Sequence, residues 1–190
     1  MPLTVVTLGE QEMLKGLARF SDLGRCRSGL PDMELPEGKR AFLNVLGFDQ
    51  PEDDAYTSPF GDEAKAAVGH LRAGFGVSYI ECEPGTGVLM HNHETVEAFL
   101  AIRGRWLIEW EGSEGNRSLV LGPLDFFACP IGVQRRFECL QAGEGDKVGL
   151  LLGIVEGNAP AAEFSPGAWR RIEQFRSQQA AALLRPLEEF

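Results

Sequence analysis

Two histidines one residue apart, His91 and His93, are the residues of this chain best suited to chemistry. Glu97 follows four positions after the second of them. The side chains of an extended strand alternate between its two faces, so the two imidazoles point to the same side, and Glu97 has the same parity. Two imidazoles and one carboxylate on one surface form a ligand set that suits a divalent transition metal with open coordination positions. The spacing therefore predicts a metal site built from His91, His93 and Glu97.

The other histidine and the cysteines show no comparable pattern. His70 stands alone, and a lone histidine is more often a structural residue than a ligand. The four cysteines lack the CxxC spacing of metal and redox sites. They are Cys26, Cys82, Cys129 and Cys139. We expect reduced thiols without a catalytic role.

Short apolar runs separated by glycine and proline turns begin at residue 75, and this pattern is typical of an all-β sandwich or barrel. The expected strands are Phe75–Cys82, Gly87–His91, Val96–Arg103, Trp106–Glu111, Ser118–Leu121, Phe126–Ala128, Arg136–Leu140 and Val148–Val155. So many short strands in about eighty residues fit a jelly roll, also called a double-stranded β-helix. Strands and helices do not alternate along the chain, which argues against a parallel α/β sheet.

The segments before and after these strands are expected to pack on the barrel. We divide the chain into an N-terminal extension at 1–74, a barrel at 75–156 and a C-terminal segment at 157–190. The extension has too little apolar content for a core of its own. Its expected elements are a helix at Glu10–Phe20, a loop at Leu30–Gly38, a strand at Arg40–Phe48, a loop at Gln50–Asp62 and a short helix at Asp62–Leu71. Pro166–Leu184 has the spacing of an amphipathic helix that docks on the barrel or on a partner subunit.

Length and charge narrow the class of protein. A chain of 190 residues with 44% hydrophobic residues is long enough for one domain with a core. The net charge of −10 argues against nucleic acid as a partner, because binding to nucleic acid needs a basic surface. The apolar runs are too short to cross a bilayer, so no membrane partner is expected. The N-terminus lacks the basic and apolar regions of a signal peptide, which predicts a cytoplasmic protein.

The segment from Gly85 to Gly104 resembles the first motif of the cupin superfamily. That motif consists of a glycine, a His-x-His pair, a glutamate and a second glycine, and all its fixed positions are filled at allowed spacing. A second cupin motif aligns in part, at Gly122, Pro130 and Gly132. The resemblance covers Phe75–Val155, less than half of the chain. It implies a jelly-roll β-barrel and, since cupins are commonly dimers, a homodimer.

The second motif departs from the cupin pattern at its ligand position. Cupins usually carry a fourth ligand, a histidine, where this chain has Arg135, and an asparagine where it has Cys139. Arginine stays protonated at ordinary pH and cannot bind a metal, so the family set is reduced to three protein ligands. Two interpretations of Arg135 remain open. It holds the carboxylate or enolate of a small acid, or it pairs with Glu97 or another acidic residue of the barrel and structurally replaces a metal.

Three functions fit these residues. The first is a small-molecule metalloenzyme of the dioxygenase or oxidoreductase type, with iron, manganese, zinc or nickel on His91, His93 and Glu97 and an anionic substrate oriented by Arg135. The second is an isomerase, lyase or decarboxylase in which the metal acts as a Lewis acid. The third is a cupin that binds a small ligand without turnover. The barrel alone does not choose among them, because this fold hosts many chemistries.

Overall fold

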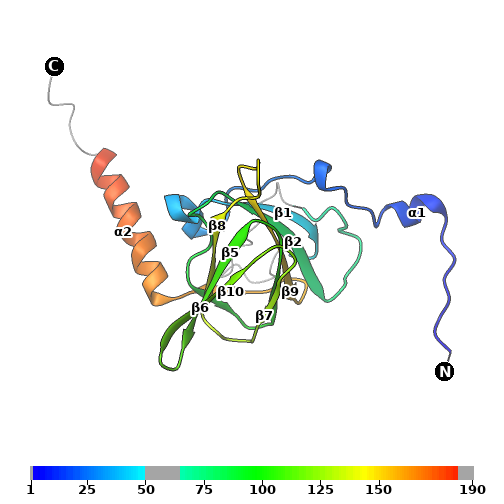
Figure 1. Ribbon diagram of the computed structural model, residues 1–190. Helices are drawn as coiled ribbons and strands as arrows, with labels where there is room; N and C mark the ends of the chain where they lie inside the picture. The colour runs from blue at the N-terminus through cyan, green and yellow to red at the C-terminus, as the bar shows by residue number, and fades with distance from the viewer. Residues whose placement is uncertain (1, 50–64, 184–190) are drawn as a thin grey trace, which may run out of the picture.

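Two antiparallel sheets, each with five strands, make up the body of the protein (Figure 1). The computed structural model describes residues 2–49 and 65–183. The strands are β1 (Ala41–Leu46), β2 (Phe75–Cys82), β3 (His91–His93), β4 (Glu97–Arg103), β5 (Arg105–Gly112), β6 (Gly115–Leu121), β7 (Phe126–Cys129), β8 (Arg135–Gln141), β9 (Gly149–Glu156) and β10 (Ala162–Phe164). The first sheet has the order β1-β2-β9-β4-β7 and the second β10-β3-β8-β5-β6. The predicted mainly-β class is confirmed.

The strand after β2 begins later than predicted. The expected strand at Gly87–His91 is wrong in its bounds, because only His91–His93 has strand geometry and Gly87 forms an isolated bridge to Glu138. The segment before His91 finds partners outside a sheet. The Gly87 N–H donates to the carbonyl of Glu37, and the Leu89 N–H donates to the carboxylate of Asp32. Side-chain and loop acceptors thus satisfy backbone groups that a regular strand would pair with a neighbouring strand.

The segments outside 75–156 add one strand to each sheet. β1, within the residues preceding 75, pairs with β2 at an edge of the first sheet. β10, which lies beyond 156 and was not predicted, pairs with β3 in the second sheet. Three short 3-10 helices, η1 (Phe20–Asp22), η2 (Pro31–Glu34) and η3 (Pro36–Gly38), precede β1. The predicted loop at Leu30–Gly38 is therefore more ordered than expected.

Two predicted helices of the N-terminal part are wrong. The helix expected at Glu10–Phe20 is reduced to α1 (Glu10–Leu14), because its apolar side chains have no surface to pack on. Met13 is 63% exposed and Leu14 54% exposed. Of the helix expected at Asp62–Leu71, the described residues 65–71 are not helical, and only 67–70 form a turn. Its first residues lie outside the described residues. The loop predicted at Gln50–Asp62 also lies outside them.

The C-terminal helix α2 (Pro166–Leu183) matches its prediction over the described residues, and Leu184 lies outside them. Ser165 caps its start, since the Ser165 hydroxyl oxygen accepts a hydrogen bond from the Ala168 N–H at 3.1 Å. Ile172 is fully buried, and the Trp169 ring lies 5.8 Å from that of Phe164. Only the first turns pack on the barrel, and the remainder extends away from it (Figure 1). No helix in the described residues has the length and apolarity to cross a membrane.

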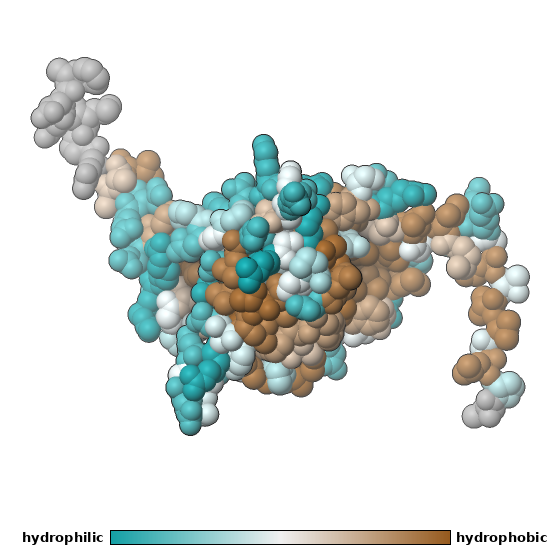
Figure 2. Space-filling model, in the orientation of Figure 1, coloured by the Kyte–Doolittle hydropathy of each residue, from teal (hydrophilic) through white to brown (hydrophobic). Residues whose placement is uncertain are grey.

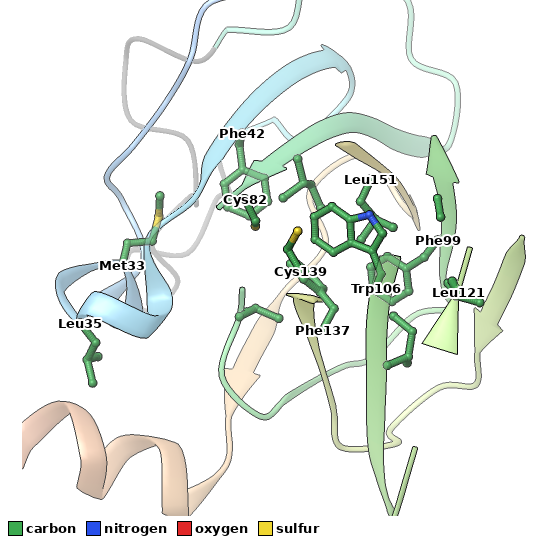
Figure 3. Packing of buried hydrophobic residues seen from close by; sticks show 14 of the residues in the cluster. Met33, Leu35, Phe42, Cys82, Phe99, Trp106, Leu121, Phe137, Cys139 and Leu151 are labelled. Atoms are coloured by element: carbon green, nitrogen blue, oxygen red, sulfur yellow. The ribbon is translucent and has the colours of Figure 1, made fainter. Parts of the chain in front are cut away.

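The core fills the space between the two sheets (Figure 3). Trp106 and Ile108 on β5 face Phe99 on β4, and all three are fully buried. The Phe137 ring lies 5.5 Å from the Phe99 ring and 6.0 Å from the Trp106 ring. All four cysteines are buried thiols. Burial raises the pKa of Cys82 to about 12, so this thiol stays protonated and is no nucleophile.

Replacing Gly87 with alanine is expected to lower the free energy of unfolding by about 1–3 kcal/mol, the usual cost of overpacking. A Cβ at Gly87 would overlap the backbone carbonyl of Phe137, so the two segments would have to separate. Urea unfolding followed by tryptophan fluorescence measures the change. Gly9→Ala is the control, because a Cβ there meets no atom within 4 Å. Equal stability of the two variants would contradict this account of the Gly87 contact.

Candidate metal centre

Three strands bring the candidate ligands together between the two sheets. β3 carries His91 and His93, β4 begins at Glu97, and β8 begins at Arg135. β3 and β8 belong to the second sheet and β4 to the first, so the group spans the interior of the barrel. His91 and Arg135 are direct neighbours in the pairing of β3 with β8. All four side chains are buried.

The predicted ligands face one another. One potential ligand atom from each of His91, His93 and Glu97 lies within 4.8 Å of the others. His91 Nε2 is 3.8 Å from Glu97 Oε2, and His93 Nε2 is 3.7 Å from Glu97 Oε1. The parity argument thus predicted the correct side for all three side chains.

Backbone carbonyls hold both imidazoles in one tautomer. His91 Nδ1 lies 2.9 Å from the carbonyl oxygen of Leu89, and His93 Nδ1 lies 2.6 Å from that of Ala161. A carbonyl oxygen can only accept, so each Nδ1 must carry the proton and donate it. The lone pair of each ring is then on Nε2, the atom that faces Glu97. This is the arrangement by which proteins orient histidine ligands for a metal.

The charge states of the group also suit a metal. Burial lowers the pKa of His93 to about 4, so its ring is neutral at pH 7. Burial opposes ionisation of Glu97, but the two histidine rings and the Arg135 guanidinium outweigh it and lower the pKa of Glu97 to about 2. A neutral imidazole and an ionised carboxylate are the forms that bind metals. His93 and Glu97 are therefore already in the protonation states that bind a divalent cation, and the residues present fit such an ion.

Arg135 binds one oxygen of the Glu97 carboxylate. Its Nε donates to Oε2 at 2.9 Å, and its Nη2 lies 2.8 Å from the same oxygen. Its Nη1 donates to the carbonyl of Val133 at 3.1 Å. The other carboxylate oxygen of Glu97, Oε1, faces His93. Of the two roles considered for Arg135, the structure contains the pairing with Glu97, and contact with a substrate anion stays a prediction.

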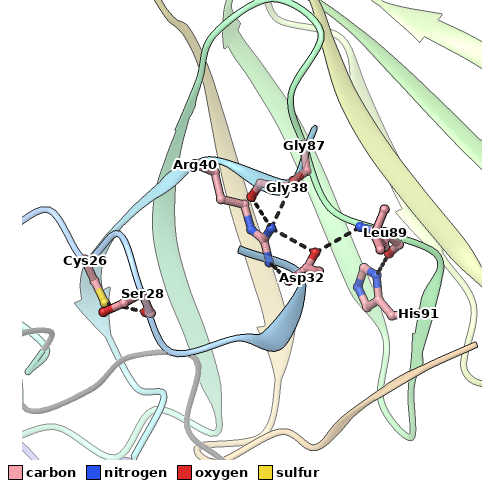
Figure 4. A network of polar contacts seen from close by, with 8 residues as sticks. All are labelled: Cys26, Ser28, Asp32, Gly38, Arg40, Gly87, Leu89 and His91. Atoms are coloured by element: carbon pink, nitrogen blue, oxygen red, sulfur yellow. Dashed lines mark hydrogen bonds and ion pairs between the residues drawn. The ribbon is translucent and has the colours of Figure 1, made fainter. Parts of the chain in front are cut away.

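Asp32 and Arg40 support the site from a distance, and the sequence analysis missed both (Figure 4). They form a fully buried ion pair, with Arg40 Nη1 and Nη2 donating to the two Asp32 oxygens at 2.9 and 2.8 Å. Asp32 Oδ2 also accepts the Leu89 N–H at 3.0 Å. The Leu89 carbonyl in turn accepts from His91 Nδ1. The ion pair therefore fixes the peptide that orients the first histidine.

Asp32→Asn is expected to weaken binding of Zn²⁺ or Mn²⁺ about tenfold, in the range seen when the supports of metal ligands are altered. The asparagine keeps the shape of the side chain but has no negative charge and only one acceptor oxygen. It cannot replace both the ion pair with Arg40 and the hydrogen bond from the Leu89 N–H. Competition with a chromophoric chelator measures the dissociation constant. Glu34→Gln, on the same 3-10 helix but in an exposed pair with Arg176, is the control. Equal affinities in the two variants would show that Asp32 does not orient His91.

No protein-family model matches the chain, and a search of curated proteins also found no match. The fold is similar to that of an oxalate oxidase, with a TM-score of 0.50 and 17% identity over 81% of this chain and 77% of that one. It is also similar to the oxalate decarboxylase of Lactobacillus farciminis, with a TM-score of 0.52 and 15% identity over 83% of this chain and 38% of that one. A cupin 2 domain-containing protein from Halorhodospira halophila gives a TM-score of 0.47 and 19% identity over 82% of this chain and 88% of that one.

At these identities the likeness to solved structures concerns the fold alone. The two sheets, their antiparallel pairing and the position of β3 between β10 and β8 agree with the jelly roll that the sequence predicted. The chain therefore has a mainly-β jelly-roll fold like that of the oxalate oxidase and oxalate decarboxylase structures.

Proposed function

We propose that the protein is a metal-dependent enzyme that acts on a small anionic molecule, with His91, His93 and Glu97 as the metal ligands. The observation that carries this proposal is the orientation of the two imidazoles. Both donate from Nδ1 to a backbone carbonyl, and both present Nε2 to the Glu97 carboxylate. A purely structural histidine needs no such common orientation. The candidate metals are iron, manganese, zinc and nickel.

A metal held there would act as a Lewis acid and, if it were iron or manganese, would also support redox chemistry. Three protein ligands leave coordination positions for a substrate.

Arg135 would supply the group that binds the anionic part of the substrate. Its Nη2 is buried and forms no well-directed hydrogen bond, although Glu97 is near. That N–H group is suited to a substrate carboxylate. Our preferred chemistry is of the dioxygenase or oxidoreductase type, and the alternative is an isomerase or lyase.

The structural neighbours suggest which substrates to test first. Oxalate oxidase and oxalate decarboxylase are named for oxalate, a small dicarboxylate. A small carboxylate also matches the charge of Arg135. Oxalate and other short mono- and dicarboxylates, including hydroxy acids, therefore form the first substrate panel for this chain.

Elemental analysis of protein purified without a metal-affinity tag is the first test. We expect about one equivalent of a transition metal per chain, as a three-ligand site holds one ion. Oxygen uptake with the carboxylate panel would then support the oxidoreductase, and turnover without oxygen would support the isomerase or lyase. Failure to bind any of the four metals, even after loading, would contradict the proposal.

A cupin that binds a small ligand without turnover is the second candidate, and the Arg135–Glu97 pair favours it. The guanidinium already provides the positive charge that a metal would bring to Glu97. Calorimetric titration of the metal-free protein with the same carboxylates tests this candidate. Binding of a carboxylate without metal, together with no turnover in the loaded protein, would select it over the enzyme.

A further inference from the structure

A pocket outside the barrel lies where helix α2 meets the short helices that precede β1 (Figure 1). Its volume of about 340 Å³ is within the range of small-molecule sites. The lining consists of residues 27–31, Met33 and Glu34 of η2, Lys39, and Arg176 of α2. No residue of the candidate metal centre lines this pocket, so the two sites are separate.

Helix α2 brings Arg176 to the pocket on the face by which it packs on the rest of the protein. Ile172 lies one turn before Arg176 on that face and is fully buried. The Arg176 guanidinium donates to both oxygens of the Glu34 carboxylate, with Nε 2.9 Å from Oε2. Arg171, earlier on the helix, lies 2.8 Å from Glu37. These contacts hold α2 against the short helices, so the pocket is part of the folded structure and needs no ligand to form it.

Positive charge gathers around the pocket, although the chain has a net charge of −10. Three cations line it, Arg27, Lys39 and Arg176, with one carboxylate, Glu34, so three positive charges less one negative charge leave a surplus of two. The hydrogen bond from Arg176, and more weakly the charge of Lys39, lower the pKa of the Glu34 carboxyl, so both cations are close to it. Figure 2 shows hydrophilic residues gathered along α2 and beside it.

Two of these cations have no counter-charge. Arg27 and Lys39 form no ion pair with any residue that the structure describes. Like charges around one cavity repel each other and do not stabilise the fold. A cleft lined by one sign of charge instead concentrates ions of the opposite sign. The arrangement therefore suits an anionic ligand.

One wall of the pocket is apolar. Leu30 and Pro31 are half-buried, and Met33 is buried. Met33 belongs to the core cluster and Leu30 packs against it, so this wall is fixed by the interior of the protein. Small-molecule sites commonly combine apolar walls with a few polar groups that fix the orientation of the ligand. A ligand that fits here has an apolar part for the wall and an anionic group for the cations.

We propose that this pocket binds a small organic phosphate, with the phosphate group held by the three cations and the apolar part of the molecule on Leu30 and Met33. A phosphate monoester carries about −1.5 to −2 charges at pH 7, which offsets the surplus of two. Its three oxygens accept hydrogen bonds, and the planar guanidinium groups of Arg27 and Arg176 match their geometry. A single carboxylate would leave one of the cations without a counter-charge. The proposal does not depend on the chemistry of the barrel.

Calorimetric titration of the metal-free protein with phenyl phosphate and with inorganic phosphate tests this proposal. Metal is left out because phosphate would otherwise also bind a metal ion in the barrel. We expect phenyl phosphate to bind with a dissociation constant of about 1 mM or below. Inorganic phosphate should bind at least about threefold more weakly, because it has no apolar part to bury on the wall. No binding of either compound at about 10 mM would overturn the proposal.

Single substitutions locate the binding. Arg27→Gln and Lys39→Gln each remove a cation that holds no ion pair, and each should raise the dissociation constant of phenyl phosphate about fivefold, the effect of one exposed charge pair. Arg170→Gln is the matched control, because Arg170 is exposed on α2 but does not line the pocket. Its dissociation constant should equal that of the wild type, and circular dichroism shows whether each variant is folded.

The contrary outcomes are distinct. An unchanged dissociation constant in both Arg27→Gln and Lys39→Gln, or an equal loss in Arg170→Gln, would overturn the assignment of binding to this pocket. Succinate, which carries two separate carboxylates, tests the chemical class of the ligand. Tighter binding of succinate than of phenyl phosphate would overturn the assignment to a phosphate.

Discussion

Replacing Arg135 with methionine is expected to lower the free energy of unfolding of the metal-free protein by about 3–5 kcal/mol, the usual cost of breaking a buried ion pair on one side. Arg135 is fully buried, and Glu97 is 6% exposed. Without the guanidinium, the Glu97 carboxylate loses its hydrogen bond from Nε and its ion-pair contact with Nη2, and it stays in the barrel interior without a permanent cation. Urea unfolding in the presence of a chelator measures the difference from wild type.

The next residue provides a matched control for that variant. Arg136 has the same side chain and also pairs with glutamates, but it lies on the outer face with 29% of its side chain exposed. Because water screens such pairs, Arg136→Met should change the stability by less than about 1 kcal/mol. Equal losses of unfolding free energy in Arg135→Met and Arg136→Met would mean that burial does not make the Arg135–Glu97 pair more important for stability.

Metal addition extends the Arg135 experiment to the site itself. A divalent cation on His91, His93 and Glu97 would restore positive charge next to the carboxylate. Zn²⁺ or Mn²⁺ should therefore stabilise Arg135→Met more than it stabilises the wild type, since a ligand that binds the folded state stabilises it according to its affinity. An identical metal effect in both proteins would show that Arg135 and the metal do not share Glu97.

The face of each candidate ligand was predictable because it depends on one strand at a time. His91, His93 and Glu97 share parity, and the bend between β3 and β4 leaves that parity intact. Arg135 lies on the inner side of β8, where it is fully buried. Its choice of partner depends on how β4 lies against β8 across the barrel, which is a tertiary distance. Local periodicity carries no information about it, so the two roles of Arg135 stayed open until the structure was known.

Elements that depend on distant partners were missed or wrongly predicted. The helix expected at Glu10–Phe20 had the correct apolar spacing, but spacing stabilises a helix only where a surface receives its apolar face. β10 is too short to show a period, and its pairing with β3 creates it. Asp32 lies in a stretch interpreted as loop, and Arg40 begins the strand expected at Arg40–Phe48. Only the fold brings Asp32 to the Leu89 N–H and Arg40 to the Gly87 carbonyl.

His91→Ala and His93→Ala are each expected to reduce bound metal from one equivalent to below about 0.1, because a three-ligand site that loses an imidazole keeps only two protein donors. Inductively coupled plasma mass spectrometry after loading and desalting measures the occupancy. Each ring makes one hydrogen bond to a backbone carbonyl, so its removal should cost only about 1–3 kcal/mol of stability and leave the fold intact.

The third histidine separates loss of the site from loss of any histidine. His70 is exposed and lies outside the barrel sheets, so His70→Ala should keep one equivalent of metal. Circular dichroism and the urea midpoint establish that all three variants are folded before occupancy is compared. Full occupancy in both His91→Ala and His93→Ala would contradict the assignment of the metal to this group. Loss in only one of them would reduce the site to two protein ligands and, because Arg135 already holds Glu97, would favour the cupin that binds a ligand without turnover.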